Sequence, residues 1–149
     1  MRPVEPSRPS WSFFVALFLA AFGLNWPWEI VQMPAYAETA GRFYSPVALA
    51  HIVPALGDVA LTFAVYGVCA LAAGRLRLSG SWNEYAAAAL LGGAVAAAYE
   101  WKALSSGWWA YGETMPVVPL LGVGLWPLLQ LTLLVPLALW LATWWGGRP

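Results

Sequence analysis

Three acidic residues of this sequence lie within or at the ends of long apolar segments: Glu29, Asp58 and Glu100. An acidic side chain in hydrocarbon costs about 2.5–3.5 kcal/mol on insertion scales, so such a residue is a functional-site candidate by default. Burial favours the protonated form of a carboxyl group, and two acids brought together divide into one protonated and one ionised group. Such a pair can protonate and deprotonate an apolar substrate, which predicts general acid–base chemistry.

Helical spacing relates other polar residues to these acids. His51 precedes Asp58 by seven residues, a separation of about 10 Å along a helix that returns to the same face. Asn25, Glu29 and Gln32 are separated by four and three residues, so they also share a face. This spacing predicts one polar site to which more than one helix contributes.

We predict a catalytic role for four of these residues. Asp58 is the first candidate for the acid because it lies deeper in its apolar segment than the other two acids. Glu100 or Glu29 would be its partner, and His51 would tune it.

The predicted substrate site places polar and aromatic side chains around these acids. Its polar members are Asn25, Gln32 and Gln130, the last near the middle of the final apolar segment. Its aromatic members can stabilise a cationic intermediate through their ring faces; they are Trp28, Trp101 and Trp126. Isomerisation, cyclisation or hydration of an isoprenoid lipid fits such a site.

The composition indicates that lipid covers most of the surface of the protein. Of 149 residues, 61% are hydrophobic and only 9% are charged, whereas soluble domains carry about 25% charged residues. The net charge of zero gives no indication of a nucleic-acid partner. Arg outnumbers Lys, and Ala, Gly and Pro are abundant, which is typical of a GC-rich bacterial genome. We therefore predict one multi-pass domain, residues 1–149, in the inner membrane.

Four apolar segments are long enough to cross a bilayer, which takes about 20 residues each. This predicts an all-α bundle of four transmembrane helices at residues 11–33, 46–74, 84–104 and 117–145. Helix signals support the ends, with Ser45 as an N-cap, Gly74 at a C-terminus, and Ser81 with Glu84 as a capping box. Residues 117–126, rich in Pro and Gly, are expected to be irregular.

Basic residues favour cytoplasmic placement of both chain ends. With the N-terminus inside, five basic residues lie on the cytoplasmic side and two on the outer side. The first group is Arg2, Arg8, Arg75, Arg77 and Arg148, and the second is Arg42 and Lys102. In this orientation the polar residues fall between the midplane and the outer boundary.

Small residues and prolines in the sequence give indications of how the helices pack and bend. Gly92, Gly93, Ala96 and Ala97 give small-xxx-small spacing, which predicts close packing and a central place for the third segment. Pro27 and Pro54 are expected to kink their helices beside the polar residues.

Two sequence echoes suggest that the two helical hairpins are parallel repeats. Trp28-Glu29 and Glu100-Trp101 each end a segment, and the segment from Pro54 to Asp58 resembles the segment from Pro127 to Gln130. Such a repeat would bring Asp58 opposite Gln130, and Glu29 opposite Glu100.

Other interpretations stay open. Glu29 and Glu100 can be interfacial residues, and Asp58 can be a structural residue bonded to Gln130, Thr62 or the backbone. The chain can also be a proton or small-solute transport component, a subunit or assembly factor of a larger membrane complex, or a homo-oligomer. A metal site formed by Glu29, Asp58, Glu100 and His51 is a weaker alternative. The sequence has one histidine and no Glu-x-x-His pair, and we predict neither a metal nor another cofactor. The expected partners are membrane lipid and a small molecule dissolved in it.

Overall fold

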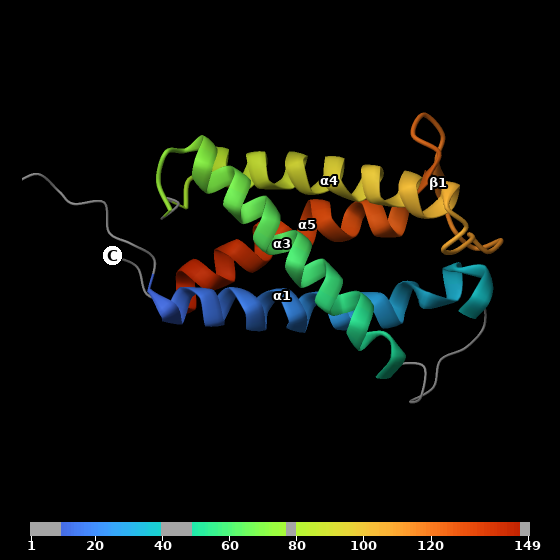
Figure 1. The fold of residues 1–149 in the computed structure, drawn as a ribbon, viewed down its shortest axis with the longest axis horizontal. Coiled ribbons are helices and arrows are strands. Elements are labelled where there is room, and N and C mark those ends of the chain that lie inside the picture. The colour runs from blue at the N-terminus through green and yellow to red at the C-terminus, as the bar shows by residue number, and fades with distance from the viewer. Residues whose placement is uncertain (1–9, 40–48, 77–79, 147–149) are drawn as a thin grey trace, which may run out of the picture.

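The computed structural model describes residues 10–39, 49–76 and 80–146 and is predominantly helical (Figure 1). Its four long helices are α1 (Trp11–Gln32), α3 (Ile52–Ala72), α4 (Trp82–Ser105) and α5 (Leu125–Trp145). Two single 3-10 turns follow α1, η1 (Met33–Ala35) and η2 (Ala37–Thr39). Two short strands, β1 (Val117–Val118) and β2 (Val123–Gly124), pair antiparallel before α5. The all-α class predicted from the sequence is confirmed.

The helices form a layer crossed by one oblique helix. In Figure 1, α5 runs between α1 and α4, and α3 crosses these helices diagonally. Residue contacts agree, because α5 packs most extensively on α4 and α1, while α3 packs mainly on α1. The third apolar segment was expected at the centre, but α5 occupies that position. The end of the bundle that carries β1 and β2 is called the hairpin end below.

Local signals account for several helix ends. The capping box is confirmed, since the Ser81 side chain accepts from the backbone of Glu84 and the Glu84 side chain accepts from the backbone of Ser81. Gly74 ends α3 in the left-handed region with φ of 64°, as predicted. Pro27 lies inside α1. The predicted kink at Pro54 is wrong, because this residue lies in the first turn of α3, where a proline is tolerated.

Two predicted helix starts differ from the structure. The proposed cap at Ser45-Pro46 lies outside the described residues, and α3 itself begins at Ile52 after a turn at His51. The last helix begins at Leu125 rather than at residue 117. The irregular backbone expected before it is present in the form of the β1–β2 hairpin, whose end is tied to the helix by a bond from Leu125 N to Pro116 O of 2.7 Å.

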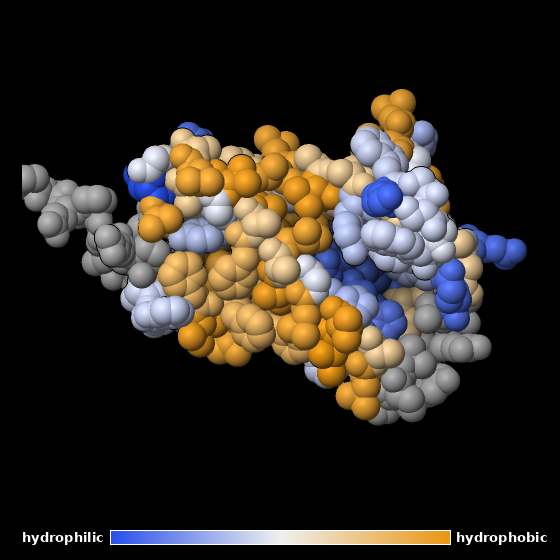
Figure 2. Space-filling view, in the orientation of Figure 1, coloured by the Kyte–Doolittle hydropathy of each residue, from blue (hydrophilic) through white to orange (hydrophobic). Residues whose placement is uncertain are grey.

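Three helical segments within the described residues are long and apolar enough to cross a membrane: Trp11–Ala35, Ile52–Ala72 and Leu125–Trp145. Large apolar side chains lie exposed on the helices, among them Val53, Leu71 and Leu90. Figure 2 shows that apolar residues cover much of the face viewed. These features are those of a membrane protein. At 24 residues α4 is also long, but its alanines, glycines and charged ends make it less apolar.

The contact between α4 and α5 depends on glycine. A β-carbon on Gly92 would lie 2.5 Å from the carbonyl oxygen of Leu131, and one on Gly93 would lie 2.7 Å from the Thr132 hydroxyl. The close packing predicted from the small residues of α4 is therefore confirmed.

We expect Gly92→Ala to lower the free energy of unfolding by about 1–3 kcal/mol, because the backbone of α5 must move away. Gly67→Ala is the matched control, since a β-carbon at Gly67 of α3 meets nothing within 4 Å. That change should be neutral or stabilise by about 0.5–1 kcal/mol. Unfolding followed by circular dichroism in mild detergent measures both, and equal stability of the two variants would contradict the packing.

Candidate functional site

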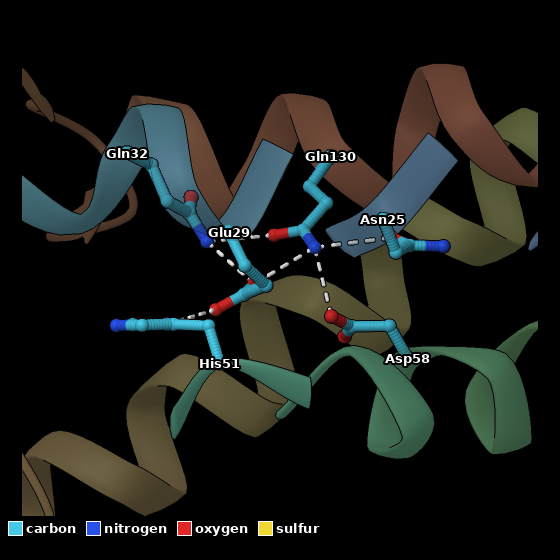
Figure 3. Close-up of polar contacts among 6 residues, drawn as sticks. All are labelled: Asn25, Glu29, Gln32, His51, Asp58 and Gln130. Carbon is cyan, nitrogen blue, oxygen red and sulfur yellow. Dashed lines mark hydrogen bonds and ion pairs between the residues drawn. The ribbon is translucent and has the colours of Figure 1, made fainter. Parts of the chain in front are cut away.

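Six polar residues from α1, α3, α5 and the turn before α3 meet near the hairpin end of the bundle (Figure 3). We call this group the carboxyl cluster; its members are Asn25, Glu29, Gln32, His51, Asp58 and Gln130. The face shared by the three α1 residues, predicted from their spacing, is turned toward α3 and α5. All three side chains are buried, as is Gln130.

Gln130 is the centre of the carboxyl cluster. Its Nε2 donates to Asp58 Oδ2 at 2.8 Å, to Glu29 Oε1 at 2.9 Å and to Asn25 Oδ1 at 3.0 Å. A carboxamide nitrogen has only two hydrogens, so these three acceptors share them. Gln130 Oε1 accepts from Gln32 Nε2 at 2.9 Å. One side chain of α5 therefore holds polar groups of both α1 and α3.

Glu29 is the carboxyl group that lies beside Asp58. Besides the bond from Gln130, Glu29 Oε1 accepts from Gln32 Nε2 at 2.7 Å. Its other oxygen, Oε2, lies 3.4 Å from His51 Nδ1, whose role as donor depends on its tautomer. Of the two partners predicted for Asp58, Glu29 is the one that shares a donor with it. His51 contacts Glu29, whereas it was expected to tune Asp58.

The charges of the cluster are unbalanced. It contains two carboxyl groups, and His51 is its one member that can become a cation. The ion pair of Arg75 with Glu84, at 2.5 Å, belongs to a different part of the fold, between the end of α3 and the start of α4. Like charges repel strongly away from water, and two neighbouring carboxyl groups that share one proton avoid this repulsion. Such a pair contains both an acid and a base.

Glu100 belongs to a second, neighbouring polar group. It is only 3% exposed, and its Oε2 accepts hydrogen bonds from the Tyr111 hydroxyl and from Trp109 Nε1. The Tyr111 hydroxyl in turn accepts from the backbone N–H of Gly124 at 2.7 Å. Glu100, predicted as a partner of Asp58, is thus held by the segment after α4, and β2 holds Tyr111.

Tyr36 lies beside Tyr111, with their ring centroids 6.0 Å apart. Burial raises the pKa of Tyr36, and the negative charges of Glu100 and Glu29 raise it further. The pKa of Tyr111 is also raised, first by burial and then by its bond to Glu100. Both phenols therefore stay protonated through the neutral range and can donate to a carboxylate.

Sequence reasoning missed these two tyrosines, because they lie in the segments that follow α1 and α4 rather than in an apolar span. One signal was present in the sequence. An Ala-Tyr dipeptide follows each of these helices, at Ala35-Tyr36 and at Ala110-Tyr111.

The segments after α1 and α4 are joined by backbone bonds. Ala37 N donates to Ala110 O at 3.0 Å, and Gly112 N donates to Ala35 O at 2.8 Å. The Glu38 side chain adds a bond of 3.1 Å from Ala110 N. These contacts join the segments that follow α1 and α4 at the hairpin end. Figure 2 shows hydrophilic residues set back in a recess beside the apolar surface of α3.

The tryptophans predicted to line the site have different surroundings. Trp101 Nε1 donates to the Leu121 carbonyl at 2.6 Å, and its ring is half exposed. Trp126 is also partly exposed. Trp28 is partly buried, and its Nε1 has no hydrogen-bond partner among the described residues. Only Trp28 shares the helix that carries Glu29.

Within the described residues, no three His, Cys, Asp or Glu side chains are grouped to hold a metal ion. Comparison of the chain with known protein families, curated proteins and solved structures gives no match. The arrangement of the side chains themselves is therefore the basis for assigning a function.

We expect Tyr111→Phe to lower the free energy of unfolding by about 1–3 kcal/mol, because it leaves a buried carboxyl oxygen of Glu100 and the Gly124 N–H short of a partner. Tyr99→Phe is the control: within the described residues no hydrogen bond joins the Tyr99 hydroxyl, and the side chain is partly exposed. Thermal unfolding in detergent compares the two. Equal loss of stability would contradict the role given to the Tyr111 hydroxyl.

Proposed function

We propose that this chain is a multi-pass protein of the bacterial inner membrane that performs acid–base chemistry on an isoprenoid or other lipid-phase substrate. The observation that carries the proposal is that Glu29 and Asp58, from two helices, accept hydrogen bonds from one nitrogen of Gln130. A merely stabilising contact does not require two carboxyl groups inside a largely apolar bundle. Proton transfer between an acid and a base does require such a pair.

The two carboxyl groups divide the task. Asp58 acts as the acid, and it is partly exposed where Glu29 is buried, so a substrate reaches it more easily. Glu29 acts as the base, since Gln32, Gln130 and His51 surround its oxygens with groups that stabilise a carboxylate. Tyr111 and Trp109 donate hydrogen bonds to the neighbouring Glu100.

Transport is less well supported. A conducted proton or solute needs polar groups along the whole path. Beyond Thr62, the middle of the bundle is filled by buried apolar side chains such as Leu17, Val65, Val135 and Leu139. A role as subunit or assembly factor is also less well supported, because the polar groups of the carboxyl cluster find most of their partners within the chain itself.

The proposal includes α4 as a fourth span, with both chain ends in the cytoplasm. Its support is the length of α4 and its packing along α5 (Figure 1). We expect green fluorescent protein to be fluorescent at either terminus, and alkaline phosphatase at the C-terminus to be inactive, because both ends face the cytoplasm. Reporters on opposite sides would show that α4 does not span.

The acid–base function is tested by hydrogen exchange at carbon. Membranes with the protein are incubated in D₂O buffer, and the organic extract is analysed by mass spectrometry. With the wild-type chain we expect a lipid that gains deuterium on carbon. For Asp58→Asn the rate of deuterium uptake should be lower by a factor of about 10² or more, because asparagine has the shape of aspartic acid but no acidic proton.

Glu113→Gln is the control for this experiment, because it removes an acid from an exposed segment outside the carboxyl cluster. Its exchange rate should equal that of the wild type. Folding of each variant is checked by size-exclusion chromatography. The same deuterium content in wild type and Asp58→Asn would rule out the proposed role of Asp58.

A further inference from the structure

Two buried polar atoms of α1 have no hydrogen-bond partner among the described residues: Gln32 Oε1 and Trp28 Nε1. Gln32 is only 6% exposed, and its side chain reaches into the carboxyl cluster (Figure 3). Leaving a buried donor or acceptor unsatisfied is costly, and more so where lipid excludes water. Both atoms therefore call for a group supplied from outside the described part of the chain.

The orientation of the Gln32 carboxamide is fixed by its neighbours. Its Nε2 donates to Glu29 Oε1 at 2.7 Å and to Gln130 Oε1 at 2.9 Å. Turning the amide over would place an acceptor against two acceptors, so Oε1 must be the atom that remains open. It requires a donor.

The second atom without a partner among the described residues, Trp28 Nε1, carries a hydrogen and requires an acceptor. Trp28 and Gln32 are four residues apart on α1, so their side chains are neighbours on one face of the helix. One chemical group that both donates and accepts would satisfy the two atoms together. A hydroxyl group does this, whereas an ammonium group has no acceptor and a carboxylate or phosphate has no donor when ionised.

We propose that Trp28 Nε1 and Gln32 Oε1 bind the hydroxyl group of an alcohol dissolved in the lipid phase. The inference rests on the proposed acid–base function and specifies its substrate class. The Gln32 carboxamide that accepts from the hydroxyl also holds Glu29 through Nε2, so the bound oxygen lies one amide group away from the carboxyl pair.

This placement defines a reaction class, the dehydration of an alcohol to an alkene and its reverse. The protonated carboxyl group gives its proton to the hydroxyl oxygen, and the C–O bond breaks with both electrons leaving on water. The carboxylate then removes a proton from the neighbouring carbon, whose C–H electrons form the C=C bond. The carboxyl pair regains its proton, and no oxidant or reductant is needed.

The test uses a photoreactive long-chain alcohol, with a diazirine near the hydroxyl, and the methyl ether of the same probe. Both are added to the full-length protein in lipid nanodiscs, and labelled residues are mapped by mass spectrometry. The ether can accept from Trp28 but cannot donate to Gln32. We expect the alcohol to label residues around Trp28 and Gln32 about tenfold more than the ether, the ratio that one hydrogen bond gives.

Trp28→Phe removes the indole N–H and should reduce labelling by both probes about tenfold. Trp101→Phe is the matched control, because the Trp101 N–H donates to the Leu121 carbonyl. This substitution should not affect labelling. Equal labelling by alcohol and ether, with Trp28→Phe the same as Trp101→Phe, would show that water fills the two positions and would overturn the inference.

The outcome is separable from that of the deuterium experiment. If labelling fails these tests while Asp58→Asn still abolishes deuterium uptake, the hydroxyl site is wrong and the acid–base function stands. If the labelling contrast holds but Asp58→Asn exchanges normally, the alcohol site is supported and the chemistry assigned to the carboxyl pair is wrong.

Discussion

The carboxamide of Gln130 is the interaction on which the polar half of this structure depends. It contacts α1 through Asn25, Glu29 and Gln32, and α3 through Asp58. A glutamine suits this position because it offers a donor and an acceptor without adding a charge. A lysine would neutralise one carboxyl group, and a leucine would remove the donor that the two carboxyl groups share. The neutral amide instead holds the two acids together without a counter-charge.

The remainder of the bundle satisfies a different requirement, which is to fill its interior without polar groups. Leu17, Val65 and Leu139 are fully buried between the helices, and Gly92 lets α4 approach the backbone of α5. Dispersion contacts between closely packed side chains hold helices together in lipid, where the hydrophobic effect gives no driving force for their association. The polar cluster is therefore confined to one end, and a rigid apolar frame positions it.

The sequence predicted the helical class, the shared face of Asn25, Glu29 and Gln32, and the capping box at Ser81, because each follows from local spacing. It also placed Asp58 opposite Gln130 through the suggested repeat, and the two side chains are in contact; the repeat itself stays a prediction. The choice between Glu29 and Glu100 beside Asp58 could not be made from spacing, since it depends on the angle at which α3 crosses the other helices.

The aromatic surroundings were predicted less well, for a related reason. Tyr36 and Tyr111 reach the acids from segments outside the helices, where no periodicity governs the direction of a side chain. Trp101 is directed to the Leu121 carbonyl by the hairpin before α5, a turn that the Pro and Gly content indicated only as irregular backbone. Tertiary contacts among loops thus decided which aromatic residues approach the cluster.

The bonds between the segments after α1 and α4 have a kinetic consequence. With Ala37 joined to Ala110 and Gly112 joined to Ala35, the segments after α1 and α4 are held together at the hairpin end, while the recess lies beside α3. A lipid-phase substrate of the kind proposed above would reach this recess by diffusing in two dimensions within the bilayer. Its rate of arrival depends on its mole fraction among the lipids rather than on its concentration in water. Adding inert lipid at a constant amount of ligand would therefore dilute it and slow its encounter with the protein.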